Sequence, residues 1–418
     1  MRNSPPDTCS SQDDTSVEAR VRAEMKLSEI GKNVWDRCAN PGWQLSESGD
    51  ISLDGSLDAP PPYNPFVAYD FLETLEATHC AIARTGWLGQ HLVLEGNNGS
   101  VHGVVPAYLK NHSQGEYVFD YGWADAFERA GGQYYPKIQI SVPFSPVTAP
   151  KLLSRPDENY EQNQRLLAAA VAELTRTHGA SSAHLTFLPK DQWSLLGEMG
   201  FLRRTDQQFH WLNEGYQTFD DFLNALSSRK RKNIKKERRE AIANDISIEW
   251  VTGQDLTEDH WDAFYGFYMD TGARKWGTPY LNRSFFSELG ARMAGRILLI
   301  LAKREDRYIA GAINMIGSDT LYGRNWGCIE DHPFLHFEVC YYQAIEFAIE
   351  HGLKRVEAGA QGAHKLARGY LPQTVYSAHF VAHEGFRRAI ADYLEHERAQ
   401  VELDSAYLAE RAPFKRSQ

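Results

Sequence analysis

The sequence predicts a mixed α/β fold built twice in tandem, and two patterns support this prediction. Helical stretches alternate with strands along both halves of the chain, which is typical of mixed sheets with flanking helices. In each half, a helix that ends in His-Gly leads into a strand, at His178-Gly179 and at His351-Gly352. With 418 residues, 42% of them hydrophobic, the chain can form two or three domains with substantial cores.

The first half begins with a polar stretch over residues 1–16, which we expect to be disordered. Apolar residues at helical spacing then predict helices over 17–38, 64–76, 161–178 and 192–199. Residues 49–62 are expected to form an exposed acidic loop. Alternating apolar and polar residues predict a hairpin around Gly96-Asn97-Asn98-Gly99 and strands over 137–147, 183–189 and 208–212.

The second half repeats this order of elements. Helices are predicted over 259–270, 282–293 and 336–351, and strands over 297–304, 308–317, 320–327, 354–360 and 375–383. A charged helix over 386–410 follows. The predicted parts are a disordered N-terminus, helix and acidic loop (1–62), a first domain (63–215), a basic helix (216–250), a second domain (251–385) and a C-terminal helix and tail (386–418).

A basic segment, SSRKRKNIKKERREAI over 227–242, stands out from an acidic chain. The segment holds eight Lys and Arg residues, and the whole chain has a net charge of -11, so without these eight cations the chain would carry about -19. Thr218 and Asp221 form a capping box that predicts the start of this helix. Unpaired buried charges are costly, so the segment must face either water or an anion, and both interpretations remain open. The candidate polyanion-binding residues are Arg229, Lys230, Arg231, Lys232, Lys235 and Lys236.

Several functional classes are excluded by what the sequence lacks. No run approaches 18 apolar residues, and no targeting segment is evident, so we expect a cytoplasmic protein without a membrane span. The five cysteines form no C-x-x-C pair, which predicts unpaired thiols in a reducing compartment. Between Glu330 and Glu338 lie five potential metal ligands, but Pro333 interrupts their spacing, and we predict no metal site.

Long stretches of the sequence closely resemble one family. They are HSQGEYVFDYGWADAFERAGGQYYPK (112–137), VPFSPVTAPKLL (142–153), LYGRNWGC (321–328) and HFEVCYYQAIEFAIEHGLKRVEAGAQGAHKLARGYLP (336–372). They resemble the Fem-like predicted N-acyltransferases of the GNAT superfamily, a family named for peptidoglycan biosynthesis. The resemblance extends over about residues 27–401.

The resemblance implies a tandem GNAT-like fold and an acyltransferase that forms amide bonds. Its donor would be an aminoacyl-tRNA or an acyl-CoA, with no tightly bound cofactor. Its acceptor would be an amine on a small molecule, a peptide or a cell-wall precursor. Because related aminoacyl ligases carry a similar basic segment, tRNA is a possible partner of residues 229–239. The alternative is a non-catalytic module that binds RNA or protein through the basic helix.

The candidate catalytic residues lie in the second domain. Acyl transfer to an amine needs a deprotonated nucleophile and a polarised carbonyl, which a carboxylate or histidine near a strand edge can supply. In a GNAT-like sheet two strands separate at this level, so we expect the candidates to surround one cleft, although each alone could be a cap or a structural partner. The predicted catalytic residues are His336, Glu338, Gln361 and His364, and the predicted substrate-binding residues are Tyr322, Arg324, Trp326, Glu357 and Lys365.

The donor site is predicted less directly. The loop CIEDHPFL, which enters the helix at His336, lacks the glycines of an ordinary CoA loop and carries Glu330 and Asp331, which would repel a phosphate. In the first domain, Lys151 and Arg155 precede a helix and could bind an anionic donor. They are equally readable as ordinary surface cations.

Overall fold

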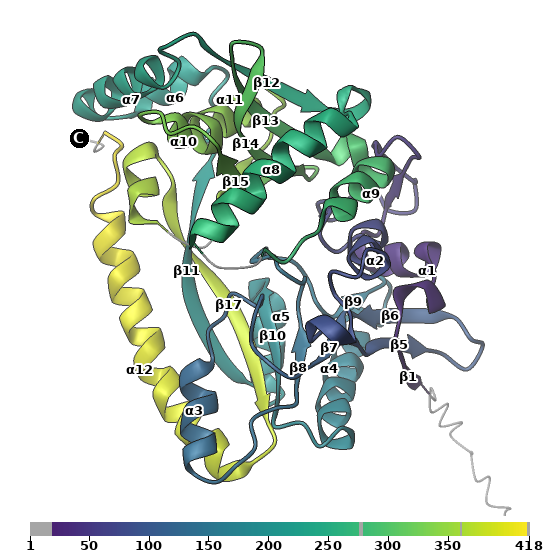
Figure 1. Ribbon diagram of the computed structural model, residues 1–418. Helices are drawn as coiled ribbons and strands as arrows, with labels where there is room; N and C mark the ends of the chain where they lie inside the picture. Colours follow the sequence, from purple (N-terminus) through teal and green to yellow (C-terminus); the bar gives the residue numbers. More distant parts are fainter. Residues whose placement is uncertain (1–18, 276–278, 360–361, 416–418) are drawn as a thin grey trace, which may run out of the picture.

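Strands from both halves of the chain join in one sheet of eleven strands (Figure 1). The computed structural model describes residues 19–275, 279–359 and 362–415. The strand order is β12-β13-β14-β15-β16-β11-β17-β10-β8-β7-β4. A second sheet, β1-β5-β6-β9, continues the first half, and β2 and β3 form a small hairpin. The predicted disorder of residues 1–16 and the predicted catalytic residue Gln361 lie outside the described residues.

The first half contains eleven strands and five α-helices among the described residues. The strands are β1 (Arg20–Glu24), β2 (Trp43–Leu45), β3 (Ile51–Leu53), β4 (Leu88–Gly89), β5 (His91–Glu95), β6 (Val101–Val105), β7 (Ala107–Lys110), β8 (Lys137–Ile140), β9 (Leu153–Ser154), β10 (Ser182–Leu188) and β11 (Leu202–Leu212). The helices are α1 (Lys32–Ala39), α2 (Tyr69–Ala77), α3 (Tyr121–Arg129), α4 (Tyr160–Thr177) and α5 (Lys190–Glu198).

The second half begins with two helices and ends with a long one. The helices are α6 (Phe219–Ala225), α7 (Ser228–Ala241), α8 (Glu258–Lys275), α9 (Arg283–Met293), α10 (Leu335–Phe337), α11 (Gln343–Glu350) and α12 (Glu384–Ala409), with a π-helical turn, Glu338–Tyr342, between α10 and α11. The strands are β12 (Ile246–Thr252), β13 (Ile297–Arg304), β14 (Arg307–Ile316), β15 (Thr320–Cys328), β16 (Arg355–Glu357) and β17 (Leu371–Val381).

The same strand-helix-strand unit occurs once in each half. In the first half, β8 and β10 are parallel neighbours connected through α4, and in the second half β15 and β16 are parallel neighbours connected through α11. In each half, the two parallel strands pair at only three positions. The last paired position joins Ile140 and Leu185 in the first half, and Tyr322 and Glu357 in the second half. Beyond these positions the strands separate, at places that we name the β8–β10 separation and the β15–β16 separation.

The two halves exchange strands at the centre of the sheet. β17 from the end of the chain lies between β10 and β11, whereas β11 from the first half lies between β16 and β17. All the pairings from β10 to β16 through these two strands are antiparallel, so β10 and β16 run in opposite directions. Each separation lies at the carboxyl end of its strand, β10 or β16. Because these two strands run in opposite directions, the two separations face each other across the middle of the molecule.

The predicted helix ends are found where the sequence placed them. His178 and His351 are the C-caps of α4 and α11, and each ring Nδ1 lies within hydrogen-bond distance of the carbonyl oxygen four residues earlier, at 3.2 and 2.9 Å. Gly179 and Gly352 follow with left-handed backbone (φ 60° and 64°), which glycine adopts without steric cost. The mixed α/β fold is confirmed.

Several predicted elements differ from the structure. The strand predicted over 137–147 ends at Ile140, and the loop expected over 49–62 contains β3. The helix predicted over 17–38 is wrong at its start, because residues 20–24 form β1 and pair with β5. The helix expected to run from Thr218 through the basic segment is two helices, α6 and α7. Leu226 between them is extended and forms a β-bridge with Phe414 of the C-terminal tail, which breaks the helix. The Thr218–Asp221 capping box is present.

Candidate active site

The β15–β16 separation begins at a bulge in β15. The pairing of β14 with β15 shifts between Ala312–Trp326 and Asn314–Gly323, so β15 has an extra residue there. Tyr322 consequently packs into the core under α8 and α9, whereas Trp326 packs against the core under α11. Tyr322, Arg324 and Trp326 alternate along the sequence and would share one face of a regular strand, but the bulge breaks the two-residue period and Trp326 lies on the other face.

Glu357, the last residue of β16, lies beside the separation and is buried, with 5% of its surface exposed. It is opposite Tyr322 on β15 and His210 on β11, so the three side chains share one sheet face. Burial raises the pKa of Glu357 to about 7, while Arg355, Arg324 and Lys151 act in the opposite direction. Among the described residues, no donor hydrogen-bonds its Oε2 atom. Glu357 is therefore a carboxylate that can exchange a proton near neutral pH.

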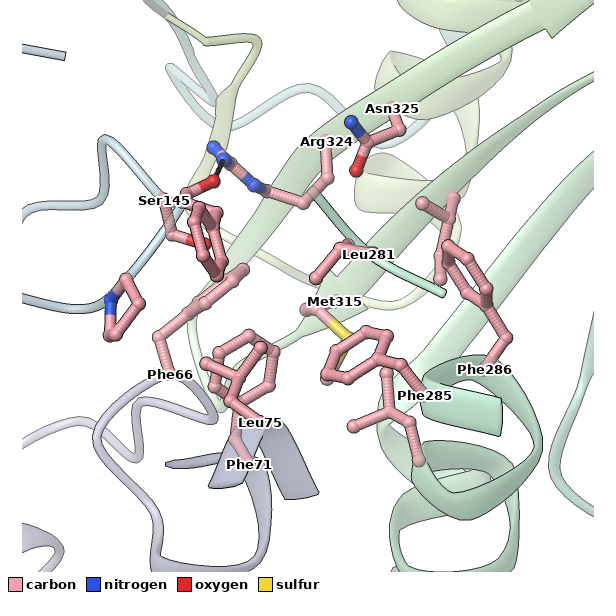
Figure 2. Close-up of a pocket in the computed structure, with 14 residues that line it drawn as sticks. Phe66, Phe71, Leu75, Ser145, Leu281, Phe285, Phe286, Met315, Arg324 and Asn325 are labelled. Atoms are coloured by element: carbon pink, nitrogen blue, oxygen red, sulfur yellow. Dashed lines mark hydrogen bonds between the residues drawn. The ribbon is translucent and has the colours of Figure 1, made fainter. Parts of the chain in front are cut away.

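Arg324 connects the two halves at this level. Its Nη2 donates to the carbonyl oxygen of Phe144 in the first half at 3.0 Å, and its guanidinium lies 5.5 Å from the centre of the Phe66 ring. Figure 2 shows Arg324 at one end of an apolar pocket between α2 and α9. The cavity is about 20 Å³, room for little more than one water molecule. Trp326 and His336 do not line it; apolar side chains including Phe71, Phe285 and Met315 do.

In each half, the ammonium group of a buried lysine donates hydrogen bonds to carbonyl oxygens near the end of a central strand. Lys151 donates to the carbonyl oxygens of Ala149 and Phe187, at 2.8 and 3.2 Å. Lys365 donates to those of Ala358 and Gly359, at 2.6 and 2.9 Å. Burial lowers the pKa of Lys151 to about 7 and that of Lys365 to about 8. Lys151 is thus no surface cation.

Arg155, the partner predicted for Lys151 in donor binding, is half-buried. Its backbone N–H bonds the carbonyl oxygen of His102, and its charge lowers the pKa of the Cys38 thiol against the larger raising effect of burial. Lys151, in contrast, is bound to the end of β10. The structure shows no contact that would join the two cations in one donor site.

Three other predicted residues gather on the opposite face of the separation. The rings of Trp326 and His336 are 5.2 Å apart, and those of His336 and His364 are 6.3 Å apart. His364 Nε2 is 2.9 Å from the hydroxyl of Tyr341, and the guanidinium of Arg368 stacks over Phe337 at 3.4 Å. The candidates predicted for one cleft therefore form two groups, one on each face of the sheet.

Glu338 serves to dock the basic helix α7. Its carboxylate accepts hydrogen bonds from Arg238 at 2.8 and 3.1 Å and from Gln343 at 2.7 Å, and it is almost fully buried. Arg238 also pairs with Glu346 at 2.6 Å. With its proton-accepting oxygens occupied in this way, Glu338 has a structural role in place of the catalytic one that the sequence suggested.

The basic helix turns one side to the protein and another to solvent. Ile234, Arg238 and Ala241 face inward, and Glu237 bonds Arg368 at 2.9 Å. The exposed cations are Arg229, Lys232, Lys235, Lys236 and Arg239, while Lys230 and Arg231 are half-buried. Lys235 and Lys236 have ion pairs with Asp220 and Glu240, both at the surface. The exposed cations of α7 therefore form a single basic face on the side turned to solvent.

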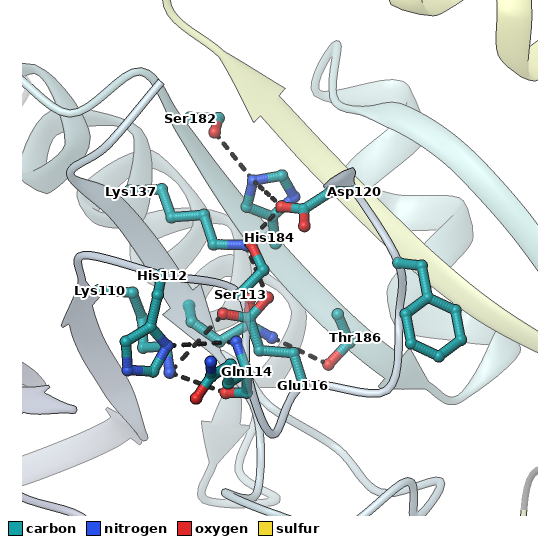
Figure 3. Close-up of polar contacts among 12 residues, drawn as sticks. Lys110, His112, Ser113, Gln114, Glu116, Asp120, Lys137, Ser182, His184 and Thr186 are labelled. Carbon is teal, nitrogen blue, oxygen red and sulfur yellow. Dashed lines mark hydrogen bonds and ion pairs between the residues drawn. The ribbon is translucent and has the colours of Figure 1, made fainter. Parts of the chain in front are cut away.

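The sequence analysis missed a buried charge network in the first half (Figure 3). Lys137 of β8 donates to Ser113 and Glu116, at 2.7 and 2.6 Å, and to Asp120. Lys110 of β7 is 3.8 Å from Glu116, and all four charged side chains are buried. Burial raises the pKa of Glu116 to about 7 and lowers that of Lys110 to about 7. Burial of so many charges is uncommon. The one sequence feature that indicates this network is the lysine at the start of the apolar strand KIQI.

In the loop before α10, the carboxylate of Glu330 is bound by neighbouring side chains. Glu330 is bound by Arg304, Arg307 and His332 at 2.7 to 3.0 Å. Within the described ranges, no group of three or more His, Cys, Asp or Glu side chains could hold a metal ion.

Among the helices that the structure describes, none has the length and apolarity needed to cross a membrane.

Sequence comparison identifies the family to which this arrangement belongs. Residues 26–416 match the model of the FemAB-like family, which is described as a family of peptidoglycan biosynthesis or recognition. The chain belongs to the FemAB-like family. Membership confirms the resemblance noted in the sequence, and the likeness to the structure of FemX shows a shared fold. No curated protein is significantly similar to the FemAB-like chain in sequence.

Several solved structures are similar to the chain at low sequence identity. The structure of FemX is 13% identical with a TM-score of 0.50, and the match covers 79% of this chain and 95% of FemX. The structure of L-PGS from Bacillus licheniformis is 8% identical with a TM-score of 0.48, covering 80% and 98% of the two chains. A tandem GNAT protein from the clavulanic acid biosynthesis pathway is 16% identical with a TM-score of 0.43, covering 88% and 99%.

Proposed function

We propose that this FemAB-like protein transfers an acyl or aminoacyl group to an amine at the β15–β16 separation, with Glu357 as the general base. The observation that carries the proposal is the state of Glu357: a buried carboxylate with a pKa raised to about 7 by burial, and with one oxygen that lacks a hydrogen-bond partner among the described residues. A general base is most effective when its pKa lies near the working pH. Strongly perturbed groups of this kind cluster at active sites.

The residues around Glu357 would have distinct roles in the reaction. The acceptor nitrogen attacks the carbonyl carbon of the donor, Glu357 accepts the proton that the nitrogen loses, and the bond to the leaving oxygen or sulfur breaks. Arg324, held at the separation by Phe144, would stabilise the negative charge on the carbonyl oxygen. His336, His364 and Trp326 lie on the other sheet face and would contact the donor there.

Aminoacyl-tRNA is the donor that the surroundings favour over acyl-CoA. The basic helix α7 docks through Arg238 on the turn that carries Glu338, and Glu237 of α7 bonds Arg368 beside Phe337, so its exposed cations flank the donor face. The loop that precedes α10 has no glycine between Cys328 and Leu335 to cradle a pyrophosphate. A cell-wall precursor with a free amine is the acceptor class suggested by the family. A non-catalytic RNA-binding module would have no use for the titratable Glu357.

The test compares donors directly. The purified protein is incubated with bacterial tRNA charged with a mixture of radiolabelled amino acids, or with acetyl-CoA, and with a lysine-containing peptide or glucosamine as the acceptor. Transfer from charged tRNA is expected, and Glu357→Gln should slow it about 10²- to 10⁴-fold. The matched control, Glu350→Gln, makes the same change at an exposed position on α11. Full activity of the Glu357→Gln variant would exclude Glu357 as the base.

A further inference from the structure

We infer that His210, on the strand next to Glu357, makes the site specific for a primary amine. Its unprotonated ring nitrogen Nδ1 accepts the second N–H of the acceptor amine, while Glu357 accepts the first. This inference rests on the proposed function and names the substrate class of the same site. The sequence analysis did not single out His210, which lies near the end of β11.

His210 and Glu357 are direct neighbours on two paired strands. In the antiparallel pairing of β11 with β16, the Cα atom of His210 is opposite that of Glu357, so both side chains project from the same sheet face. Side chains paired in this way have Cβ atoms about 4.5–5.5 Å apart. The flanking residues of β11, Phe209 and Trp211, pack into the core on the opposite face. Glu357 is opposite Tyr322 at the last paired position before β15 and β16 separate, and His210 is therefore beside that position too.

Hydrogen bonds to the first half fix which ring nitrogen of His210 carries the proton. The side-chain Nε2 of Gln208 donates to the carbonyl oxygen of Pro146 at 2.9 Å, and a carbonyl oxygen can only accept. The amide oxygen Oε1 of Gln208 lies 3.2 Å from His210 Nε2 and can only accept as well, so Nε2 carries the proton. Burial lowers the pKa of His210 to about 3, and Arg355 and Lys365 act in the same direction, so the ring is neutral. Nδ1 is consequently a hydrogen-bond acceptor.

One segment of the first half supports two sides of the site. Phe144, two residues before Pro146, accepts the hydrogen bond of Arg324 through its carbonyl oxygen at 3.0 Å. This segment therefore holds both Arg324, the group proposed to stabilise charge on the carbonyl oxygen of the donor, and Gln208, the group that orients His210. Gln208 and His210 are 1% and 5% exposed, which keeps bulk water away from these contacts.

Two hydrogen-bond acceptors side by side match the reacting form of a primary amine. The Oε2 atom of Glu357 has no donor among the described residues, and Nδ1 of His210 has no proton to give it. A neutral primary amine has two N–H bonds and one lone pair. The proton of one N–H passes to Glu357, the other N–H is bound by His210 and stays intact, and the lone pair forms the bond to the carbonyl carbon of the donor. A secondary amine has a carbon in place of the second N–H, so Nδ1 would lose its partner in a buried site, which is costly.

The experiment compares a lysine-containing peptide with the same peptide carrying Nε-methyl-lysine. The two amines have similar basicity and nucleophilicity, and they differ by one N–H. With the donor that wild type uses, kcat/KM should be roughly 10- to 100-fold higher for the unmethylated peptide, the range expected for one buried acceptor left without a partner. With glucosamine as the acceptor amine, N-methylglucosamine is the matched analogue.

Two variants of His210 separate recognition of the amine from packing. In His210→Asn the amide oxygen can take the place of Nδ1, so the preference should stay within about 3-fold of wild type. In His210→Gln the amide nitrogen can take the place of Nε2 and keep the bond to Gln208, but no acceptor replaces Nδ1, and the preference should fall to about 3-fold or less. A purely structural role would give the opposite order, since the contact with Gln208 survives only in His210→Gln. His396→Gln, the same change at an exposed histidine of α12, is the control.

The outcomes are separable from those of the proposed function. The expected order of the two variants supports the inference. No preference in wild type, or equal or reversed preferences in the two His210 variants, overturns it, while transfer that depends on Glu357 leaves the proposed function intact. A wild-type protein that transfers to neither amine would overturn the proposed function and the role of His210 with it. Thermal unfolding shows whether each variant is folded, and the preference of wild type is measured without any variant.

Discussion

His184 and Glu357 lie at the same sequence spacing in the two halves but have opposite properties. Each is the sixth residue after the histidine that ends its helix, and each lies on the strand that follows. His184 Nδ1 is 2.7 Å from His379 Nδ1, its Nε2 is 2.8 Å from Ser182, and burial lowers its pKa to about 3. Glu357 retains an oxygen without a partner among the described residues and has a pKa raised to about 7 by burial.

This difference indicates that the two halves of a duplicated fold can have different roles, one in stability and the other in catalysis. In the first half the polar residues pair with one another, and the chain itself covers the β8–β10 separation, since the backbone N–H of Ala149 bonds the carbonyl oxygen of Phe187. In the second half Glu357, at the same spacing after the helix, is a group that can change its protonation state. We therefore expect the first half to contribute stability and positioning, and the second half to contribute the base.

The largest expected effect is on catalysis and tests this division directly. Glu357→Gln should lower kcat about 10²- to 10⁴-fold, whereas His184→Gln should leave kcat within about 10-fold while it lowers the melting temperature. In wild type, kcat/KM should rise as the pH increases through about 7, because Glu357 must be deprotonated to act as a base. Rate-pH profiles of the two variants measure this. A rate-pH profile of Glu357→Gln identical to that of wild type would break the comparison.

The second effect is on stability and belongs to the first half. Lys137→Met should destabilise the protein by about 3–5 kcal/mol, because Glu116 and Asp120 would remain buried without their cation. Denaturant unfolding measures the loss. The matched change at the surface is Arg129→Met, which removes the exposed pair with Asp125 and should cost about 1 kcal/mol or less. Equal losses in the two variants would show that the network contributes no more than a surface ion pair.

The sequence predicted local structure well and long-range structure poorly, for physical reasons. Helix ends at His178 and His351 follow from glycine and apolar spacing, which act over a few residues. Exchange of β11 and β17 depends on pairings between strands about 170 residues apart, which no local pattern encodes. The helical spacing of Val21 and Met25 predicts a helix over residues 20–24, although pairing with the strand β5 decides their conformation.

The candidate site was predicted in part. Arg324, Glu357 and Lys365 do lie near the β15–β16 separation, but the bulge in β15 sends Trp326 to the other sheet face, and one extra residue in a strand leaves no mark in the sequence. The place of Glu338 at a helix start predicts a catalytic role, but its partner Arg238 lies a hundred residues earlier, and no local pattern indicates that contact.

A third prediction concerns how the stability of each half depends on pH. The folded-state pKa of His184 is lowered, so the unfolded chain binds more protons below about pH 6.5, and the stability that His184 contributes is lost as the pH falls toward 3. The free energy of unfolding changes with pH by at most about 1.4 kcal/mol per pH unit for this one group. Glu357 has the opposite sign: its raised pKa makes the fold lose stability as the pH rises from about 4.5 to 7. Unfolding free energies of His184→Gln and Glu357→Gln from pH 5 to 8, relative to wild type, should slope in opposite directions; slopes of the same sign would contradict the assignment.

The smallest expected effect concerns the basic face of α7, an exposed cationic helix on the second half. Arg229, Lys232 and Lys236 are exposed and lie three and four residues apart, so they form one stripe on the helix. Like charges so close together repel one another, and a phosphate backbone would relieve this repulsion.

If this stripe binds the acceptor arm of a charged tRNA, changing the three residues to Glu should weaken tRNA binding about 10-fold near physiological salt. It should also lower the slope of log affinity against log salt by about 2 to 2.7, since each phosphate contact contributes about 0.7 to 0.9. Filter binding from 50 to 200 mM salt measures both quantities. Lys26, Lys190 and Arg388 are exposed elsewhere, and their change to Glu alters the net charge equally, so it controls for general repulsion of RNA. Unchanged binding and slope in the α7 variant, or undetectable tRNA binding by wild type at low salt, would mean that α7 is a solvated face, and acyl-CoA would then become the preferred donor.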